Sequence, residues 1–279
     1  MRFKAGRFTY DFPRTALVMG IINVTPDSFY NGGCYFDTES AVERAFELVE
    51  QGADILDIGG ESTRPGAQPV EESEELKRVI PVIERVADKV NIPISIDTVK
   101  PGVARRAVAA GASIINDVMA NREEPEMWKI VAETGVGYIV NHIKGTPQTM
   151  QLNPVYSDVV KEVNEYFEER LRRLKSAGVN EEKVILDPGL GFGKTVEHNL
   201  KILRNIRAFA KWGRPVMIGA SRKSFIGKVL NLDVKFRLSG SLACAAWAVM
   251  NGVKIIRVHD VSETVQVVKM IEAIMLEGE

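Results

Sequence analysis

Hydrophobic positions occur in two kinds of segment that alternate along the whole chain. Short runs rich in valine and isoleucine are separated by longer segments with the i, i+3, i+4, i+7 spacing of amphipathic helices. This alternation is typical of parallel β/α units. The short runs predict eight strands, at Leu17–Asn23, Ile55–Gly59, Ile94–Asp97, Ile114–Asp117, Tyr138–Asn141, Val184–Asp187, Val216–Gly219 and Ile255–Val258.

The helical segments between these strands have recognisable limits. The segment Glu71–Val90 places aliphatic residues on one helical face, and Ser157–Ala177 is followed by Gly178, a residue type that commonly ends helices. The last such pattern covers Ser262–Met275. Open doubly wound sheets usually have fewer strands, whereas eight strands, each followed by a helix, close a barrel. We therefore predict the α/β class and a single (β/α)8 barrel domain over residues 1–279.

Composition removes several classes of function. The 279 residues include 36 Lys plus Arg and 37 Asp plus Glu, with 45% hydrophobic residues, which describes a globular protein without the basic excess that nucleic acid binding requires. No run is long and apolar enough for a membrane span, and Ala16–Ile22 is too short for a signal peptide. Cys34 and Cys244 cannot form a disulfide framework. We expect a cytoplasmic protein with no nucleic acid or membrane partner.

Polar residues stand at the carboxyl ends of most predicted strands. In β/α barrels this end carries the active site, because the strand interiors fill a packed core. The residues that end the strands or follow them are Asn23, Asp97, Asn116, Asp117, Asn141, Asp187, Lys223, Arg257 and His259. Each alone could be a helix cap or turn residue. Together they indicate one binding site at the mouth of the barrel.

One group of these residues suits a flat ligand rich in hydrogen-bond donors. The group consists of Asp97, Asn116, Asp187 and Lys223. Charges buried there would cost several kcal/mol unless they pair with one another or with a ligand. The carboxylates only accept, the asparagine does both, and the lysine donates. A heterocycle with an amino group beside a ring N–H, and an acceptor elsewhere on its edge, would satisfy this set.

A second group suits a phosphate or diphosphate. Arg64, Arg257 and His259 come from different strand ends, and arginines beside glycine-rich loops are typical phosphate ligands. Arg64 alone could equally be a solvated surface charge. Asn23 could add an oxygen ligand for Mg²⁺, with the other ligands coming from substrate and water. The three histidines are scattered and show no zinc-like spacing.

The glycine-rich segment Gly189–Thr195 superficially resembles a nucleotide-binding P-loop. The P-loop spacing requires glycine at position 188, where this chain has Pro188. We interpret the segment instead as a rigid loop that presents Phe192 near the mouth.

The ordered motifs of the chain resemble those of the dihydropteroate synthase family. The resemblance runs from about Val18 to the C-terminus and rests on Gly20–Phe29, Asp57–Gly66, Ser95–Thr98, Ile115–Asp117, Asp187–Lys194, Ser221–Ser224 and Arg257–Asp260. Each motif alone is modest, whereas the complete ordered set is highly specific.

The resemblance implies condensation of (7,8-dihydropterin-6-yl)methyl diphosphate with 4-aminobenzoate in folate biosynthesis. Diphosphate would depart to leave a stabilised pterin cation, which the arylamine attacks without a protein nucleophile. By resemblance, the pterin is held by Asp97, Asn116, Asp187 and Lys223, the diphosphate by Arg257 and His259, and Mg²⁺ by Asn23. Likewise, the aminobenzoate pocket is bordered by Thr63, Arg64, Pro65, Phe192 and Ser224. Lys223, Arg257, His259 and Asp97 are the residues expected to act in catalysis.

Two departures from the family pattern concern loops. Many members have Asp where this chain has Asn31, and Met-Arg or Met-Gln where it has Ile143-Lys144. The first departure removes a charge from the first loop, where Asp27 remains, and neither affects the expected fold.

Two other functions stay open. A corrinoid-type methyltransferase would bind a methylated folate in a similar barrel, but it has little need for a diphosphate site with Arg64, Lys223, Arg257 and His259. An inactive paralogue would bind only pterin or another protein, without turnover. The alanine-rich helix predicted over Leu238–Met250 could pack against a partner barrel or against its own core, and the resemblance favours a homodimer.

Overall fold

The computed structural model describes residues 1–12, 16–25, 38–64, 66–120 and 125–276. Eight parallel strands within these ranges form one sheet, in the order β8-β7-β6-β5-β4-β3-β10-β9. The strands are β3 (Leu17–Asn23), β4 (Ile55–Gly59), β5 (Ile94–Asp97), β6 (Ile114–Asp117), β7 (Gly137–Asn141), β8 (Val184–Asp187), β9 (Met217–Ile218) and β10 (Ile255–Val258).

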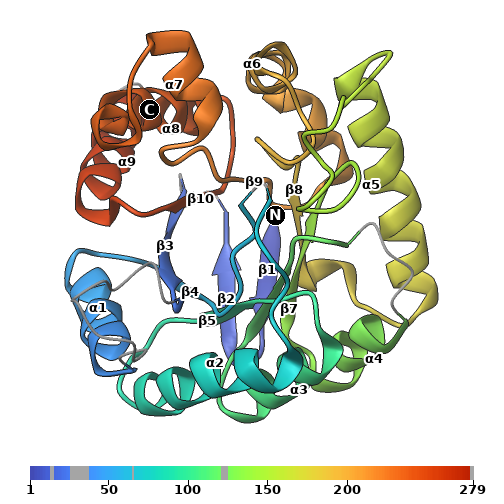
Figure 1. Ribbon diagram of the computed structural model, residues 1–279, viewed down its shortest axis with the longest axis vertical. Coiled ribbons are helices and arrows are strands. Elements are labelled where there is room, and N and C mark those ends of the chain that lie inside the picture. The colour runs from blue at the N-terminus through green and yellow to red at the C-terminus, as the bar shows by residue number, and fades with distance from the viewer. Residues whose placement is uncertain (13–15, 26–37, 65, 121–124, 277–279) are drawn as a thin grey trace.

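The two edge strands of this sheet, β8 and β9, meet and nearly close it into a barrel (Figure 1). They join through an isolated bridge between Leu186 and Val216, and the Leu186 N–H donates to the Pro215 carbonyl at 3.0 Å. The predicted (β/α)8 fold is confirmed. Six strands have the predicted bounds, and β7 begins one residue earlier. Strand β9 is shorter than predicted, because Val216 pairs only through this isolated bridge and Gly219 lies beyond the last ladder pair, Ile256 with Ile218.

Helices surround the barrel, with their apolar faces against the outward side chains of the strands (Figure 1). Their interior positions keep the helical period, and the Asp158 side chain caps α5 by accepting from the N–H groups of Val160 and Lys161. The helix predicted over Leu238–Met250 has these same bounds. The helices are α1 (Thr38–Glu50), α2 (Glu72–Ala87), α3 (Pro101–Ala109), α4 (Pro125–Thr134), α5 (Val159–Ser176), α6 (Val196–Arg204), α7 (Ser224–Leu230), α8 (Leu238–Met250) and α9 (Val261–Leu276), with 3₁₀ turns η1 (Glu181–Lys183), η2 (Ile206–Trp212) and η3 (Val234–Phe236).

The inward face of the barrel changes from apolar to polar along the strands. Near the start of the strands, the inner cluster contains Leu17, Met19, Ile55, Ile114, Ile139, Ile185, Met217 and Ile255. Side chains alternate between the two faces of a strand, so the residue two positions later points inward again. On five strands that later residue is polar or charged, namely Asp57, Asn116, Asn141, Asp187 and Arg257.

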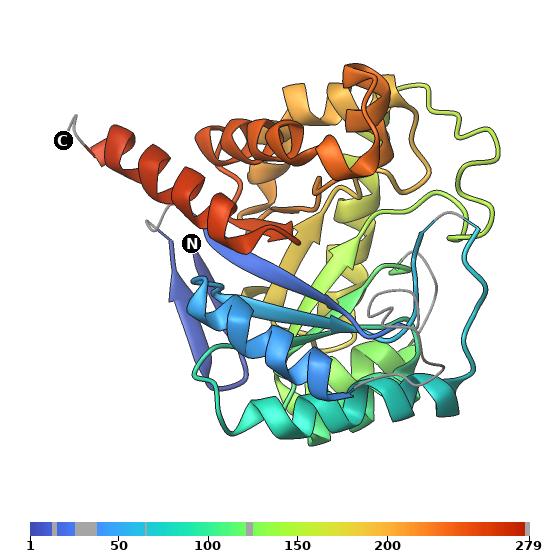
Figure 2. The ribbon, with the colours of Figure 1, turned by 60° about the vertical axis from the view of Figure 1, so that its left-hand side comes forward.

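An N-terminal hairpin, which the sequence analysis did not predict, closes the apolar end of the barrel. Strands β1 (Arg2–Ala5) and β2 (Phe8–Asp11) pair antiparallel, and Phe3 is fully buried in the inner cluster. Its ring packs so closely on Gly137 that a Cβ there would lie 2.8 Å from the Phe3 Cζ. Figure 2 shows the hairpin at one end and the long loops after β4 and β7 at the other. The sequence analysis recognised strands as short runs rich in valine and isoleucine, and the hairpin strands RFKA and FTYD contain neither residue.

No helix in the described part of the chain is long and apolar enough to cross a bilayer.

Candidate active site

Arg257 lies at the centre of the polar end of the barrel. Its Nε donates to Asp57 Oδ2 at 2.6 Å, and its Nη2 donates to Asp97 Oδ2 at 2.7 Å. The Asn116 Nδ2 donates to the same Asp57 oxygen at 3.0 Å. Burial alone would lower the pKa of Arg257, but the Asp57 and Asp97 carboxylates raise it above its ordinary value. The guanidinium is therefore charged and bridges two neighbouring strands, β4 and β5.

Several acceptor atoms around Arg257 are left unused. Asp57 Oδ1, Asp97 Oδ1 and Asn141 Oδ1 are buried and have no hydrogen-bond partner among the described residues. The Asn141 Nδ2 donates to the Val118 carbonyl at 3.0 Å, which fixes the orientation of its amide. Buried acceptors without donors are costly and rare in folded proteins. A ligand that brings several N–H groups would remove this cost.

The pKa of Asp97 is raised, because its carboxylate is buried and one of its oxygens has no donor among the described residues. Burial raises the pKa of Asp97 to about 7; the neighbouring Asp57 charge also raises it, while Arg257 lowers it. Hydrogen-bond donors from a ligand stabilise the charged form of a carboxylate. Binding of a donor-rich ring would therefore favour ionised Asp97.

Asp187 and Lys223 form the opposite side of the cluster. The Asp187 Oδ1 accepts from the Gly189 N–H at 2.7 Å, and burial raises the pKa of this carboxyl while Lys223 lowers it. Burial lowers the pKa of Lys223 to about 8, against the opposing effects of Asp187 and Asp97. The Lys223 ammonium donates to the Leu190 carbonyl and lies 4.6 Å from the centre of the Phe192 ring. Asp97, Asn116, Asp187 and Lys223 thus converge as the sequence predicted.

His259 is held in a neutral form beside Arg257. The Ser221 Oγ accepts from the backbone N–H of His259 at 3.2 Å and lies 2.9 Å from the ring atom His259 Nδ1, to which its hydroxyl can donate. This arrangement favours the tautomer that carries its proton on Nε2. Burial, together with the nearby charges of Arg257, Arg222 and Arg64, lowers the pKa of His259 to about 4. Arg64, although exposed, therefore lies on the same side as His259.

The two predicted groups are one continuous cluster. We assigned Arg257 to the diphosphate group, and the structure places its guanidinium against Asp57 and Asp97 of the ring-binding side. Asp57 was not among the predicted site residues, and Asn141 was predicted only as a polar strand end at the mouth, without a role in binding. The sequence pattern could have indicated both residues. Each stands two positions after an inward-facing isoleucine, Ile55 or Ile139, and therefore also points into the barrel.

A cavity of about 260 Å³ opens beside Asp97, between the loops after β4 and β7. Its lining includes Thr63 of the β4 loop, Thr98 after β5, and Thr146 and Pro147 of the β7 loop. The β4 loop is tied to the neighbouring helices, because Lys100, just before α3, forms ion pairs with Glu61 of this loop and with Glu75 of α2.

Of the predicted pocket residues that the structure describes, Thr63 lines this cavity, whereas Arg64, Phe192 and Ser224 do not. Ser224, the first residue of α7, is exposed, and Phe192 is half-buried. Pro65 and Asn31 lie outside the described residues.

The chain offers few metal ligands of its own. Asn23, at the end of β3, is partly exposed, and the described residues contain no group of three or more His, Cys, Asp or Glu side chains that could hold a metal. Mg²⁺ prefers six oxygen ligands. A single asparagine oxygen fits a Mg²⁺ ion that takes its other ligands from a bound diphosphate and water.

The comparisons with known proteins agree with this geometry. Residues 19–259 match the family model of pterin binding enzymes. The dihydropteroate synthase of Escherichia coli strain K12 is 50% identical over 256 residues, which cover 92% of this chain and 90% of that protein. The structure of Xanthomonas albilineans dihydropteroate synthase with 4-aminobenzoic acid has a TM-score of 0.92 at 42% identity, covering 98% of both chains. A second Xanthomonas albilineans structure, in complex with 7,8-dihydropteroate, has a TM-score of 0.88 at 39% identity, covering 99% of both. The chain belongs to the dihydropteroate synthase family of pterin binding enzymes.

Proposed function

We propose that this chain condenses (7,8-dihydropterin-6-yl)methyl diphosphate with 4-aminobenzoate to give 7,8-dihydropteroate and diphosphate. As a member of its family, the chain is a transferase of folate biosynthesis. The observation that carries the proposal is the set of buried, unused acceptors on Asp57, Asp97 and Asn141 at the polar end of the barrel, where the charged Arg257 contacts both aspartates. A pterin ring supplies the missing donors, because its amino group and adjacent ring N–H groups lie along one edge.

The pterin would lie within the converged cluster. Asp97 and Asp187 would accept from the ring N–H and amino groups, and Asn116 would both donate and accept. Lys223 would donate to the ring carbonyl or nitrogen. Charge-assisted hydrogen bonds of this kind are short and strong in a buried site.

The reaction requires charge to be stabilised at two places. The bond between the pterin methylene carbon and the diphosphate oxygen breaks, and both electrons leave with the diphosphate. Arg257, Arg64 and the Nε2–H of His259 would stabilise that developing negative charge, while Asp97 and Asp187 favour the cationic ring. The aminobenzoate nitrogen then attacks the methylene carbon and loses a proton. No nucleophile of the chain is needed.

Mg²⁺ is part of this proposal. Asn23 would hold the ion together with diphosphate oxygens and water, and the bound ion would supply positive charge beside the leaving group.

The aminobenzoate would occupy the cavity side of the mouth. Thr63 and Arg64 come from the β4 loop, Phe192 from the loop after β8, and Ser224 from the start of α7. Pro65, adjacent in sequence to Arg64, completes the proposed set. The half-buried Phe192 ring offers a flat apolar surface to an aromatic substrate.

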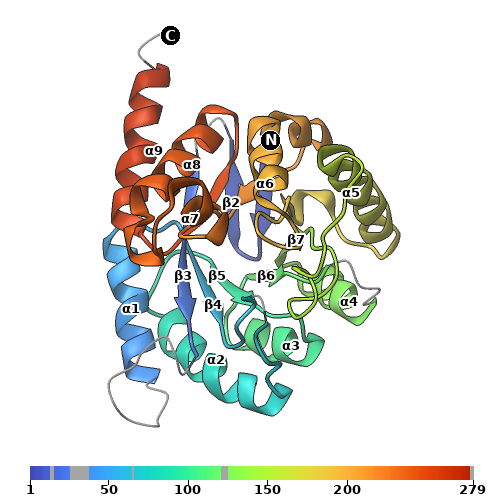
Figure 3. The same ribbon diagram turned by 45° about the horizontal axis from the view of Figure 1, so that its top comes forward.

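We also infer a homodimer and a cytoplasmic location. Trp247 and Met250 of α8 are 48% and 57% exposed, and Val229 and Leu230 of the neighbouring α7 are exposed as well. Figure 3 shows α7, α8 and α9 side by side on one flank of the barrel. An apolar face of this kind commonly marks a protein interface. Sedimentation velocity should show a species of twice the chain mass.

The activity test uses the purified chain with Mg²⁺ and both substrates. We expect 7,8-dihydropteroate and diphosphate in equal amounts, and no dihydropteroate when 4-aminobenzoate is omitted. Binding of the pterin diphosphate without turnover would identify an inactive paralogue. Methyl transfer from a methylated folate to a corrinoid would instead identify the methyltransferase.

A further inference from the structure

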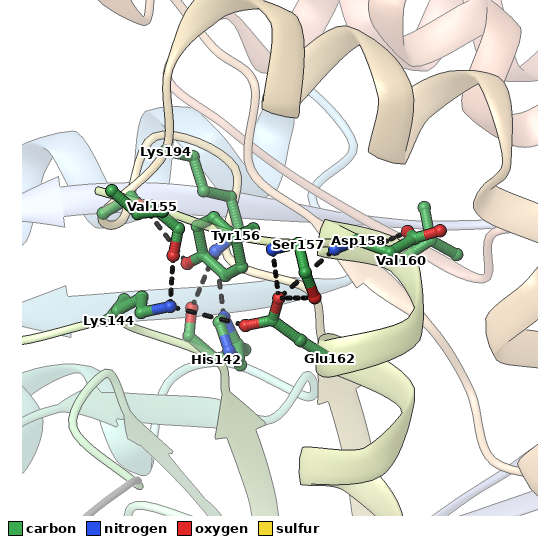
Figure 4. Close-up of polar contacts among 10 residues, drawn as sticks. His142, Lys144, Val155, Tyr156, Ser157, Asp158, Val160, Glu162 and Lys194 are labelled. Atoms are coloured by element: carbon green, nitrogen blue, oxygen red, sulfur yellow. Dashed lines mark hydrogen bonds and ion pairs between the residues drawn. The ribbon is translucent and has the colours of Figure 1, made fainter. Parts of the chain in front are cut away.

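Lys194 is a buried lysine that the proposed reaction does not use. It ends the segment of residues 188–194, here called the β8 loop, and is 3% exposed. Its ammonium lies 3.0 Å from His142 Nδ1, 3.0 Å from the Phe192 carbonyl oxygen and 3.3 Å from the His142 carbonyl oxygen. Three N–H donors therefore face three acceptors, and all three acceptors are uncharged. Figure 4 shows Lys194 and His142 together beside the Tyr156 ring.

This placement is costly for a charged group. Burial lowers the pKa of Lys194 well below its ordinary value, although the Asp187 charge raises it. An ammonium removed from water without a carboxylate in contact is stabilised only by its hydrogen bonds. The acceptors belong to two separate segments, because His142 follows β7 and Phe192 lies in the β8 loop. Lys194 consequently ties the β8 loop to the end of β7.

The backbones of the two segments are in direct contact at this tie. Gly189 has φ +69°, and a Cβ there would lie 1.9 Å from the His142 carbonyl oxygen. The Tyr156 hydroxyl adds a second tie by donating to the Gly193 carbonyl at 2.9 Å. The β8 loop is therefore held against the β7 side from both of its ends.

The opposite side of the same loop contacts Lys223. The Leu190 carbonyl accepts from the Lys223 ammonium, and the Lys223 Nζ lies 4.6 Å from the centre of the Phe192 ring. A Cβ on Gly191 would lie 3.1 Å from Lys223 Cδ. The β8 loop thus forms the wall along which Lys223 extends toward Asp187. A displacement of this loop would move both the Lys223 ammonium and the Phe192 ring.

We propose that Lys194 is a positioning residue, which acts through the β8 loop to place Lys223 and Phe192 for the two substrates, and that Tyr156 assists it. The proposal rests on the proposed function. A tie that only stabilised the fold would change the amount of folded enzyme and leave substrate affinity unchanged. A positioning role changes affinity in the molecules that remain folded.

The first test replaces Lys194 by methionine, which keeps the length of the side chain and removes its donors. We expect KM for both substrates to rise about tenfold, because small misplacements of binding groups are costly, while kcat falls less than about threefold. Amide hydrogen exchange in peptides covering residues 188–195 should become faster, which can be measured without turnover.

Lys144→Met is the matched control. The Lys144 ammonium also lies over the Tyr156 ring, at 4.2 Å, but it bonds to the Val155 carbonyl and to Glu162, outside the β8 loop (Figure 4). We expect its KM values to equal those of the wild type. An equal rise in both variants would overturn the proposal, as would a Lys194→Met enzyme with wild-type KM and a kcat reduced only in proportion to its folded fraction.

Tyr156→Phe provides a second test should Lys194→Met fail to fold. It removes only the hydroxyl that bonds the β8 loop, and we expect KM to rise about threefold, in keeping with the loss of one hydrogen bond. Unchanged KM and unchanged hydrogen exchange would overturn the proposal. The failure of the proposed function is a separate result, because the wild-type enzyme would then form no dihydropteroate.

Discussion

The two ends of the barrel use the same strands for opposite purposes. At the N-terminal end of the strands, the inward residues are apolar and Phe3 of the hairpin covers them. The chain therefore buries this end with its own side chains and needs no ligand there. Two residues further along, the strands carry Asp57, Asn141 and Arg257, and several of their acceptors have no donor among the described residues. The difference shows how stability and function are separated in one core. The first end contributes apolar burial, whereas the second is complete only when a ligand binds.

The largest expected effect tests the apolar end. Phe3→Ala should lower the free energy of unfolding by about 3–5 kcal/mol, because it leaves a cavity beneath the inner cluster. Urea denaturation measures this loss, and KM and kcat per folded molecule should not change. The matched control is Phe8→Ala in the same hairpin, whose ring is partly exposed and should cost less. A changed KM in Phe3→Ala would mean that the two ends are coupled.

The next effect tests the polar end. Arg257→Met removes the cation that bridges Asp57 and Asp97, and kcat/KM should fall by about 10²–10³, the cost of losing one donor to developing charge. Steady-state kinetics measure it. Arg222→Met is the control, because Arg222 lies at the same mouth but pairs with Asp260 in place of Asp57 and Asp97. A similar loss in both variants would mean that overall positive charge matters and the placement of Arg257 does not.

The smallest effect concerns Asp97 and pH. Asp97→Asn should weaken pterin binding by about 1.5–3 kcal/mol, roughly ten- to a hundredfold, through loss of a charged hydrogen bond. Calorimetric titration with a pterin measures this change, and unaltered affinity would remove Asp97 from the pterin site.

The same variant tests the raised pKa. Because the folded pKa of Asp97 is about 7, against an unfolded value near 3.8, the folded state binds the proton more tightly. The wild type should therefore lose stability as pH rises from about 4 to about 7 and change little from this source above pH 7. In the Asp97→Asn variant, the free energy of unfolding should lack this part of its dependence on pH. Unfolding free energies that run parallel across this range in the two proteins would contradict the raised pKa.

Local pattern was sufficient for the barrel strands and for most of the cluster. Strand periodicity depends on neighbouring residues only, and polar residues at the ends of parallel strands must meet at one mouth. The hairpin was missed because its strands, RFKA and FTYD, contain no valine or isoleucine, the residues by which the barrel strands were recognised. The partners of Arg257 were missed because the pairing joins residues 200 and 160 positions apart.

By itself, the sequence determined the order of strands and helices, the alternation of inward and outward residues, and the motifs of the family. These properties depend on short-range geometry and on residue type. Only the tertiary structure decided which acceptors are buried without donors, that Arg257 joins the two predicted groups, and that Lys194 ties one loop to another. Those properties depend on which distant atoms share a water-free space, and no local pattern carries that information.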